Sequence, residues 1–287
     1  MHIVITLVPI NRKSSLPINY NYFLTGLIYR TIEKSSKDFA QFLHSDGYRI
    51  DTSKKGFKLF TYSRLLYEEY SIRGEIITFE QNHIDWRISS PVQEFIEHLV
   101  NGVFMEGQEV NIGPESRNTM FIIEKLMSLP SPTFKESMRF LCLSPITISK
   151  TINRSSRLNG SSCSNGLNGL NSLNRLNSSC HYIRPWEEGF SDAIKENLIK
   201  KYRLVYGETI KSPEFEIKVD TDYLNKRSGK IIKKINFKGT DIIGWEAPFV
   251  ANGNPKLLEI GYEAGFGEKG SMGFGMVKET VQAAQTV

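Results

Sequence analysis

The chain has 287 residues, which is enough for two ordinary domains or one large one. Hydrophobic residues make up 40% and aromatic residues 11%, which excludes a wholly disordered chain, and the net charge of +5 is compatible with a polyanionic partner. The apolar first residues run directly into Asn11-Arg12-Lys13, and no segment reaches the ~18 apolar residues of a membrane span. We therefore expect a cytoplasmic protein that does not bind a membrane.

Metal and cofactor sites are not indicated. The three cysteines, Cys142, Cys163 and Cys180, show no C-x-x-C spacing, which predicts neither a zinc site nor a disulfide framework. Carboxylates occur as isolated pairs such as Glu68-Glu69 and not as a cluster at ligand spacing. We therefore expect no metal and no cofactor.

The first half of the chain predicts one α+β domain. Strand-like patterns cover residues 2–10, 58–63, 74–79, 84–88 and 119–125. Apolar residues at helical spacing predict helices over 20–33, 36–43 and 90–103, the last with Ser90 and Gln93 as a capping box and Pro91 at its first position. The order, close to β-α-β-β-α-β, is typical of a ferredoxin-like domain with two helices on one face of an antiparallel sheet.

The second half repeats this order after the Pro130-Ser131-Pro132 linker. Strands are predicted over 138–148, 214–219, 230–237, 241–250 and 274–280, and helices over 187–202 and 255–262. We therefore predict two tandem ferredoxin-like (RRM-like) domains, residues 1–130 and 131–287. The second contains an insert, 155–180, with eight Ser, six Asn and three Gly. This composition buries too little apolar surface to offset its ordering entropy, so we expect a flexible loop.

A glycine-rich loop, residues 261–275, is the most informative stretch. Glycine lets the backbone approach a ligand closely and lets successive N–H groups line an anion site. The loop residues that we expect to hold a phosphate backbone are Gly265, Gly267, Lys269, Gly270, Gly273 and Gly275. Residues 265–270 also match G-x-G-x-x-G, but a dinucleotide fingerprint follows a strand and opens a helix, whereas this loop follows a helix and leads into a strand. A nucleotide-cofactor enzyme is therefore the less favoured interpretation.

A basic run precedes the loop. Residues 226–238 contain six Lys or Arg and no acid, and Ile235 and Phe237 alternate with polar residues, as in a strand with one face in the core and one cationic face. A cationic strand beside an anion-binding loop favours a nucleic acid partner. Lys230, Lys233 and Lys234 are the candidate contacts.

Several separated motifs together resemble one family. The loop ends Gly-Phe-Gly-Glu-Lys-Gly-Ser-Met-Gly-Phe-Gly, residues 265–275. The other segments that carry the resemblance are Leu7-Val8-Pro9, Gly26-Leu27-Ile28-Tyr29, Phe42-Leu43-His44, Lys58-Leu59-Phe60-Thr61-Tyr62-Ser63 and Leu143-Ser144-Pro145-Ile146. Together, and in their order along the chain, these motifs resemble those of the CRISPR-associated endoribonucleases that process precursor CRISPR RNA, the sixth Cas family. The likeness covers nearly the whole chain except the insert, and that family has tandem ferredoxin-like domains.

The resemblance implies a catalytic set of Tyr29, His44 and Lys58. From the residues alone, His44 is the one of five histidines at a helix end within a basic region, and imidazole suits proton transfer near neutral pH. Lys54 or Lys55 could replace Lys58, because the stretch between histidine and lysine varies in length in the family. The implied reaction is metal-independent attack by the 2′-hydroxyl of CRISPR repeat RNA, giving a 2′,3′-cyclic phosphate and a 5′-hydroxyl.

Two partner questions and one alternative function stay open at this point. A homodimer and association with other CRISPR-associated proteins of an effector complex are compatible with the sequence. The alternative is a non-catalytic repeat-RNA-binding module, because ferredoxin-like sheets are shared with RNA recognition motifs and residues 273–277, Gly-Phe-Gly-Met-Val, are similar to their central signature.

Overall fold

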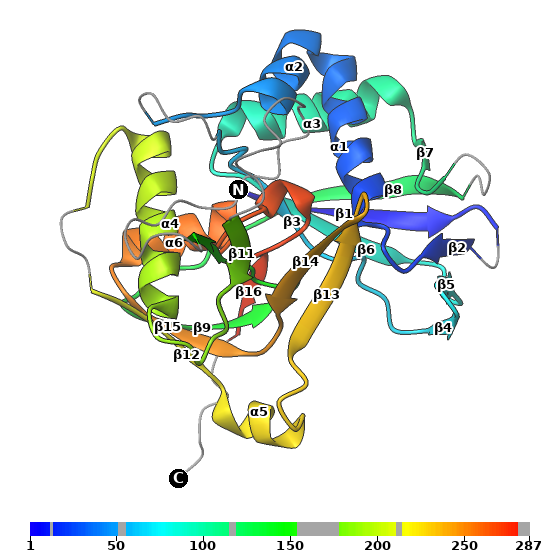
Figure 1. The fold of residues 1–287 in the computed structure, drawn as a ribbon. Helices are drawn as coiled ribbons and strands as arrows, with labels where there is room; N and C mark the ends of the chain where they lie inside the picture. Colours follow the sequence, from blue (N-terminus) through cyan, green and yellow to red (C-terminus); the bar gives the residue numbers. More distant parts are fainter. Residues whose placement is uncertain (12–13, 51–55, 115–118, 154–177, 211–213, 281–287) are drawn as a thin grey trace.

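A computed structural model describes residues 1–11, 14–50, 56–114, 119–153, 178–210 and 214–280. It shows a mixed α+β chain of two domains with antiparallel sheets, as the sequence predicted (Figure 1). Each domain has its own cluster of buried apolar side chains, one between residues 3 and 123 and the other between residues 138 and 277. Among the described residues, no helix is long and apolar enough to cross a membrane.

The N-terminal sheet has the strand order β3-β6-β1-β8-β7, and all its pairs are antiparallel. Its strands are β1 (His2–Pro9), β3 (Thr61–Tyr62), β6 (Ile84–Ser89), β7 (Glu109–Asn111) and β8 (Met120–Leu129). Helices α1 (Asn21–Ser35), α2 (Lys37–Ser45) and α3 (Gln93–Glu106) lie on the same side of this sheet (Figure 1).

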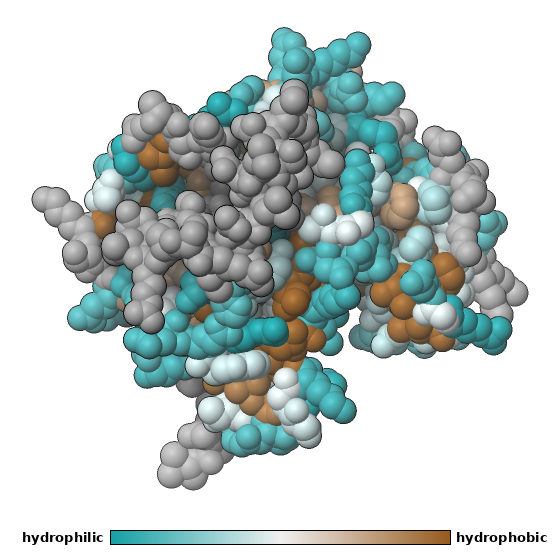
Figure 2. Space-filling view, viewed as in Figure 1, coloured by the Kyte–Doolittle hydropathy of each residue, from teal (hydrophilic) through white to brown (hydrophobic). Residues whose placement is uncertain are grey.

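A second, smaller sheet belongs to the same domain. Its order is β2-β5-β4, formed by β2 (Ser14–Pro17), β4 (Tyr70–Arg73) and β5 (Ile76–Phe79). Tyr70 and Ile72 on the edge strand β4 are exposed. Apolar side chains gather over β4 and β5 on the surface, and a notch separates this region from the rest of the molecule (Figure 2).

The C-terminal sheet has the order β12-β15-β9-β16, formed by β9 (Ser137–Cys142), β12 (Phe215–Val219), β15 (Phe249–Gly253) and β16 (Val277–Glu279). Numbered by position in the β-α-β-β-α-β repeat, both sheets have the order 2-3-1-4, with β7 as an addition to the first. Helices α4 (Phe190–Tyr206) and α6 (Pro255–Ala264) pack against this sheet. We propose residues 1–130 and 131–287 as the two domains, because their sheets end at Leu129 and begin at Ser137.

The remaining elements connect the sheet strands. They are the hairpins β10 (Ser149–Asn153)–β11 (Ser178–Tyr182) and β13 (Ile232–Phe237)–β14 (Thr240–Trp245), the short helix α5 (Thr221–Lys226) and the 3₁₀ turn η2 (Gly270–Met272). Residues 154–177 of the predicted insert lie outside the described residues, whereas residues 178–180 pair with β10 in β11. The flexible-loop prediction is therefore wrong for its last three residues.

Several predicted boundaries are also wrong. Helix α3 begins at Gln93, not at Pro91, because Ser90 directs its hydroxyl to the carbonyl of Leu59 and accepts from the N–H of Val92 instead of capping the helix. The predicted strand 138–148 ends at Cys142, just before Ser144-Pro145, and the predicted strand 241–250 divides at Pro248, because proline has no N–H to donate to a ladder.

Two further expectations need correction. The strand expected over 58–63 is confined to Thr61 and Tyr62, because Leu59 has a φ of +51° that interrupts extended backbone. Cys142 is free and buried, but Cys180 is disulfide-bonded, a single bond that the cysteine spacing did not indicate when it was taken to exclude a zinc site and a disulfide framework.

The first residues of the chain hold the two domains together. The ring of His2 stacks on the ring of Tyr262 in α6, with centroids 3.9 Å apart, and its Nε2 lies 3.0 Å from the Tyr262 carbonyl oxygen. Burial lowers the pKa of His2 to about 3, so this ring is neutral at physiological pH. The N-terminal ammonium and the hydroxyl of Ser89 both donate to Glu263, at 2.7 and 2.9 Å. The start of β1 therefore lies against the end of α6.

Candidate active site

The side chains of Tyr29, His44 and Lys58 lie together at the C-terminal end of α2. The Tyr29 and His44 rings meet edge to face, with centroids 5.8 Å apart at 78°. The ammonium of Lys58 donates to the main-chain carbonyl of His44 at 3.1 Å. Since the three residues come from α1, α2 and the segment before β3, the fold brings together groups that are 29 positions apart at the extremes.

The end of α2 explains how Lys58 reaches His44. Gly47, with a φ of +64°, terminates the helix and donates its N–H to the carbonyl of Phe42 at 2.8 Å. A Cβ at Gly47 would lie 2.5 Å from the carbonyl oxygen of Phe57 and 3.2 Å from Nζ of Lys58. The glycine therefore provides the turn and also the space that the lysine fills. A cation is favourable there because the carbonyl end of a helix is partly negative.

The three side chains differ in exposure and in protonation. His44 is exposed, while Tyr29 and Lys58 are partly buried behind it. Burial raises the pKa of the Tyr29 hydroxyl well above its ordinary value, so this group stays protonated near neutral pH and keeps a proton to donate in a hydrogen bond. Burial also lowers the pKa of the Lys58 ammonium; Asp46 opposes this shift and Arg49 adds to it. The arrangement offers one accessible imidazole with a hydroxyl donor and a cation beside it.

The alternative lysines, Lys54 and Lys55, lie outside the described residues. Lys58 is thus the predicted lysine that can be placed beside His44. Its catalytic role stays a prediction.

The glycine-rich loop runs from α6 to β16 and packs against the N-terminal domain (Figure 1). Four of its carbonyls accept hydrogen bonds from side chains of that domain. Thr25 donates to Ser271 at 3.1 Å, and Thr61 donates to Phe274 at 2.8 Å. The Asn21 amide donates to Met272 at 3.2 Å and to Gly273 at 3.5 Å. The loop is therefore part of the domain interface, and its solvent-accessible portion is the half-buried tip from residue 269 to 272.

The glycines of the loop are required by contacts within the chain itself. A Cβ at Gly273 (φ +81°) would lie 2.5 Å from the Asn21 amide nitrogen and 2.6 Å from the ring of Tyr62. A Cβ at Gly267 (φ +80°) would lie 2.3 Å from the carbonyl oxygen of Thr147. The nearest main-chain atoms would lie 2.5 Å from a Cβ at Gly270 and 2.3 Å from one at Gly275, whereas the nearest atom at Gly265 would lie 3.1 Å away. We expected close backbone approach at these glycines, and the structure shows that their near neighbours include the protein's own atoms.

The basic run covers the last residue of α5, the turn after it, β13 and the start of the hairpin tip. Lys230, Lys233 and Lys234 are exposed, and Lys234 is paired with Asp241 at 2.6 Å. We expected Ile235 in the core, but it is only half-buried, because within the described part of the chain β13 and β14 form a two-stranded sheet of their own. Figure 1 shows the hairpin extending from α5 toward α1.

The hairpin and the glycine-rich loop converge on the first half of α1. At the hairpin tip, Phe237 meets the ring of Tyr22 edge to face with centroids 5.7 Å apart, and the N–H of Asn236 donates to the side chain of Asn19 at 3.1 Å. Lys238 lies 4.5 Å above the Tyr22 ring as a cation–π contact. Both predicted RNA-binding segments therefore touch the helix that carries Tyr29.

The sequence interpretation missed the two residues that join α1 to the loop, Asn21 and Thr25. They precede Tyr29 by eight and four positions, so the three residues share one face of the helix. A polar row at this spacing beside an apolar stripe was the available signal. The hydroxyl of Thr25 is also hydrogen-bonded to the hydroxyl of Tyr62, with the two oxygens 2.6 Å apart.

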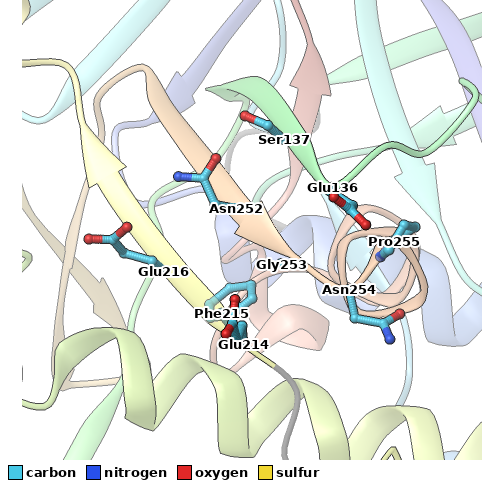
Figure 3. Close-up of a pocket in the computed structure, with 9 residues that line it drawn as sticks. All are labelled: Glu136, Ser137, Glu214, Phe215, Glu216, Asn252, Gly253, Asn254 and Pro255. Atoms are coloured by element: carbon cyan, nitrogen blue, oxygen red, sulfur yellow. The ribbon is translucent and has the colours of Figure 1, made fainter.

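A cavity of about 720 Å³ lies elsewhere, between β12, β15 and the start of α6 (Figure 3). Three carboxylates surround it, and its lining residues are Glu136, Ser137, Glu214, Phe215, Glu216, Asn252, Gly253, Asn254 and Pro255. Since like charges repel a phosphate backbone, this cavity does not fit an RNA site. None of the predicted site residues lines it.

Comparison with known proteins supports the resemblance seen in the sequence. The family model described as "CRISPR associated protein Cas6, C-terminal" matches residues 129–279, and the model described as "CRISPR-associated protein Cas6, N-terminal" matches residues 15–126. Together these two matches cover both domains.

Individual proteins agree with the family models. The chain is 32% identical to a CRISPR-associated endoribonuclease Cas6 of Pyrococcus furiosus, over 97% of this chain and 89% of that protein. It is 31% identical to a CRISPR-associated endoribonuclease Cas6 of Methanocaldococcus jannaschii, over 91% and 86%. A solved structure titled "CRISPR associated protein Cas6" superposes with a TM-score of 0.72 at 29% identity, covering 98% of this chain and 99% of that one. With both sheets, both family models and full-length relatives in agreement, the chain belongs to the Cas6 family of CRISPR-associated proteins.

Proposed function

We propose that this protein is an endoribonuclease that cuts CRISPR repeat RNA within the precursor transcript without a metal ion. The observation that carries the proposal is the contact between Tyr29, His44 and Lys58 at the end of α2. The relatives in Pyrococcus furiosus and Methanocaldococcus jannaschii, which match over most of their length, are both named endoribonucleases. The geometry and the relatives support the same activity.

The reaction needs only groups on the RNA and these three side chains. The 2′-oxygen attacks the adjacent phosphorus, its proton leaves to a base, and the bond from phosphorus to the 5′-oxygen breaks as an acid supplies a proton to that oxygen. His44, the accessible imidazole, transfers one of these protons. Tyr29 stays protonated and orients a phosphate oxygen or the imidazole, while Lys58 stabilises the negative charge of the phosphorane.

The RNA path in this proposal follows the basic hairpin and the tip of the glycine-rich loop toward α1. Lys230, Lys233, Lys234 and Lys269 supply positive charge along that path. Its support is the convergence of both segments on α1, since Asn19, Tyr22 and Thr25 all precede Tyr29 on or beside that helix. The partner in this proposal is CRISPR repeat RNA, as the membership of the Cas6 family supports.

Incubation of the protein with repeat RNA in excess EDTA tests the proposal. We expect cleavage at an undiminished rate, with a 2′,3′-cyclic phosphate on the upstream product and a 5′-hydroxyl on the downstream product. Loss of cleavage in EDTA that Mg²⁺ restores, or a 5′-phosphate on the product, would contradict the mechanism. Tight binding of the RNA with no cleavage under any condition would favour a repeat-RNA-binding module instead.

A further inference from the structure

Lys201 is a buried cation whose ammonium points into the glycine-rich loop. It lies on α4, with only 5% of its surface exposed. Its Nζ donates to three main-chain carbonyls, those of Ala264 at 3.1 Å, Gly265 at 2.6 Å and Gly267 at 2.7 Å. An ammonium has three N–H groups, so it can donate to all three of these carbonyls.

This contact caps the end of α6 from another helix. The last carbonyls of a helix have no partner within it and carry partial negative charge, which a cation stabilises. Ala264 is the final residue of α6, and Gly265 begins the loop with a φ of +84°. Because a buried ammonium without partners would be strongly destabilising, Lys201 and the three carbonyls constrain one another.

The orientation of these carbonyls also determines where the N–H group on the opposite side of each peptide points. In a trans peptide the C=O and the following N–H point in opposite directions. The peptides whose carbonyls Gly265 and Gly267 direct to Lys201 therefore turn the N–H groups of Phe266 and Glu268 away from it. The N–H of Phe266 donates to the carbonyl of Gly275 at 2.9 Å, and the N–H of Glu268 donates to the carbonyl of Thr147 at 2.7 Å.

These two bonds define the base of the loop. The bond from Phe266 to Gly275 closes the segment between them, and the bond from Glu268 to Thr147 anchors it beside β10. Beyond this base, the tip reaches Thr25 of α1 through the carbonyl of Ser271. A single lysine in α4 is thus connected through consecutive peptides to the helix that carries Tyr29.

We infer that Lys201 is a positioning residue, which fixes the glycine-rich loop in the conformation that binds the RNA backbone. It does not touch the RNA and acts through the peptides of residues 264–268. The part of the inference that concerns RNA rests on the proposed function, whereas the part that concerns the loop does not.

Amide hydrogen exchange in the full chain without RNA tests the loop directly. Lys201→Met removes the ammonium but keeps an unbranched side chain, and Lys201→Gln keeps two N–H donors without the charge. We expect exchange at Phe266 and Glu268 to accelerate about 10- to 100-fold in the Met variant, as for loss of a buried charged hydrogen-bond partner, and less in the Gln variant. Amides of β1 and β8 should keep their rates in both variants. Lys200→Met, an exposed lysine on the same helix, is the matched control and should change neither set.

The RNA readout separates positioning from a general loss of stability. We expect Lys201→Met to raise the Kd for repeat RNA about 10-fold or more, while the single-turnover rate at saturating RNA stays within about threefold of wild type. If the wild-type protein does not cut RNA, the proposed function fails, but the exchange experiment still decides the role of Lys201.

Three outcomes would overturn the inference. The first is exchange at Phe266 and Glu268 within about twofold of wild type in a folded Met variant. The second is equal acceleration of the loop and of the β1 and β8 amides, which would mean that Lys201 stabilises the whole fold. The third is failure of both the Met and the Gln variants to fold, which would assign Lys201 to the core and not to the loop.

Discussion

The candidate active site and the glycine-rich loop differ in how closely the protein surrounds them. His44 is exposed at a helix end and its ring meets that of Tyr29, whereas Gly273 and its neighbours up to Val277 are buried, with Gly273 against Asn21 and Tyr62 of the other domain. A change at His44 therefore alters the chemistry of the site and little else. A change at a loop glycine alters the domain interface first, so that lost cleavage alone would not show that the glycine touches RNA.

His44→Ala gives the largest effect on activity and the smallest on stability. Proton transfer by a positioned side chain contributes about 10²- to 10⁴-fold to rate, so single-turnover cleavage should fall by that factor. Because the side chain is exposed, the free energy of unfolding should change by no more than about 0.5 kcal/mol, and the Kd for RNA should stay within about twofold.

His83→Ala is the matched control for this variant. His83 is also exposed, and it pairs with Glu124 at 3.1 Å on the small-sheet side of the N-terminal domain. It should retain full cleavage activity. Equal cleavage by the His44 and His83 variants would remove His44 from the mechanism.

The opposite behaviour is expected for Gly273→Ala. Its Cβ would meet Asn21 and Tyr62 at 2.5 and 2.6 Å, and its φ of +81° is unfavourable for any side chain. Gly229→Ala offers a comparison, because Gly229 has a φ of +70° and nothing within 4 Å of its Cβ.

The comparison separates backbone strain from steric overlap. The Gly229 variant should lose about 1–2 kcal/mol of unfolding free energy from the left-handed backbone alone. The Gly273 variant should lose a further 1–3 kcal/mol or so through overpacking. Denaturant unfolding of both variants checks this, and equal losses would mean that the interface yields to the extra methyl group.

The sequence predicted the elements around the site better than the contacts that complete it. Periodicity was sufficient for α1, α2 and α6, because each buries one apolar stripe. It could not indicate that the Leu59 backbone turns with a positive φ, or that Ser90 bonds to the carbonyl of Leu59 and so fails to cap α3. Both features depend on tertiary contacts between segments far apart in sequence.

The clustering of glycines was visible in the sequence, but its physical reason was not. The atoms that exclude a Cβ at Gly267 and Gly273 come from Thr147, Asn21 and Tyr62, at least 120 positions away. Lys201 gave no sequence signal either, since a lysine within a helix usually faces solvent, and its carbonyl partners lie more than 60 positions later. Local patterns identify such segments without identifying what they contact.

The pH dependence of cleavage tests the role of Lys58, the partly buried cation beside His44. Burial lowers the pKa of Lys58 below the ordinary lysine value of 10.5, so its charge is lost as pH rises through that lowered pKa. Cleavage should therefore decline on the alkaline side below pH 10.5. Lys58→Arg should abolish this decline, because guanidinium stays charged.

Tyr29→Phe serves as the control for the alkaline decline. Burial raises the pKa of Tyr29, so its hydroxyl does not titrate in the same range, and this variant should keep the decline while cutting more slowly. Single-turnover rates from about pH 7 to about pH 10, corrected for uncatalysed alkaline hydrolysis of the RNA, give the profiles. A decline that survives in the Arg variant would mean that Lys58 is not its source.

The smallest expected effect is a change in RNA affinity, through the lysines that attract the phosphates. If the glycines chiefly serve the domain interface, lysines must supply most of the attraction for the RNA backbone, and Lys234 already shares its charge with Asp241. Asp241→Asn should release that charge and tighten RNA binding by up to about fivefold, the range for an exposed ion pair. The salt dependence should steepen by up to about 0.7 in the slope of log affinity against log salt, the value for one phosphate of a single strand.

Asp192→Asn is the matched control, because Asp192 pairs with Lys195 at 2.7 Å on α4, outside the basic run. It removes the same single negative charge and so accounts for the change in net charge. RNA titrations at several salt concentrations distinguish the two variants. Equal tightening by both would show that overall charge, and not the hairpin, attracts the RNA, and the structural glycines would then need a second role as phosphate ligands at the loop tip.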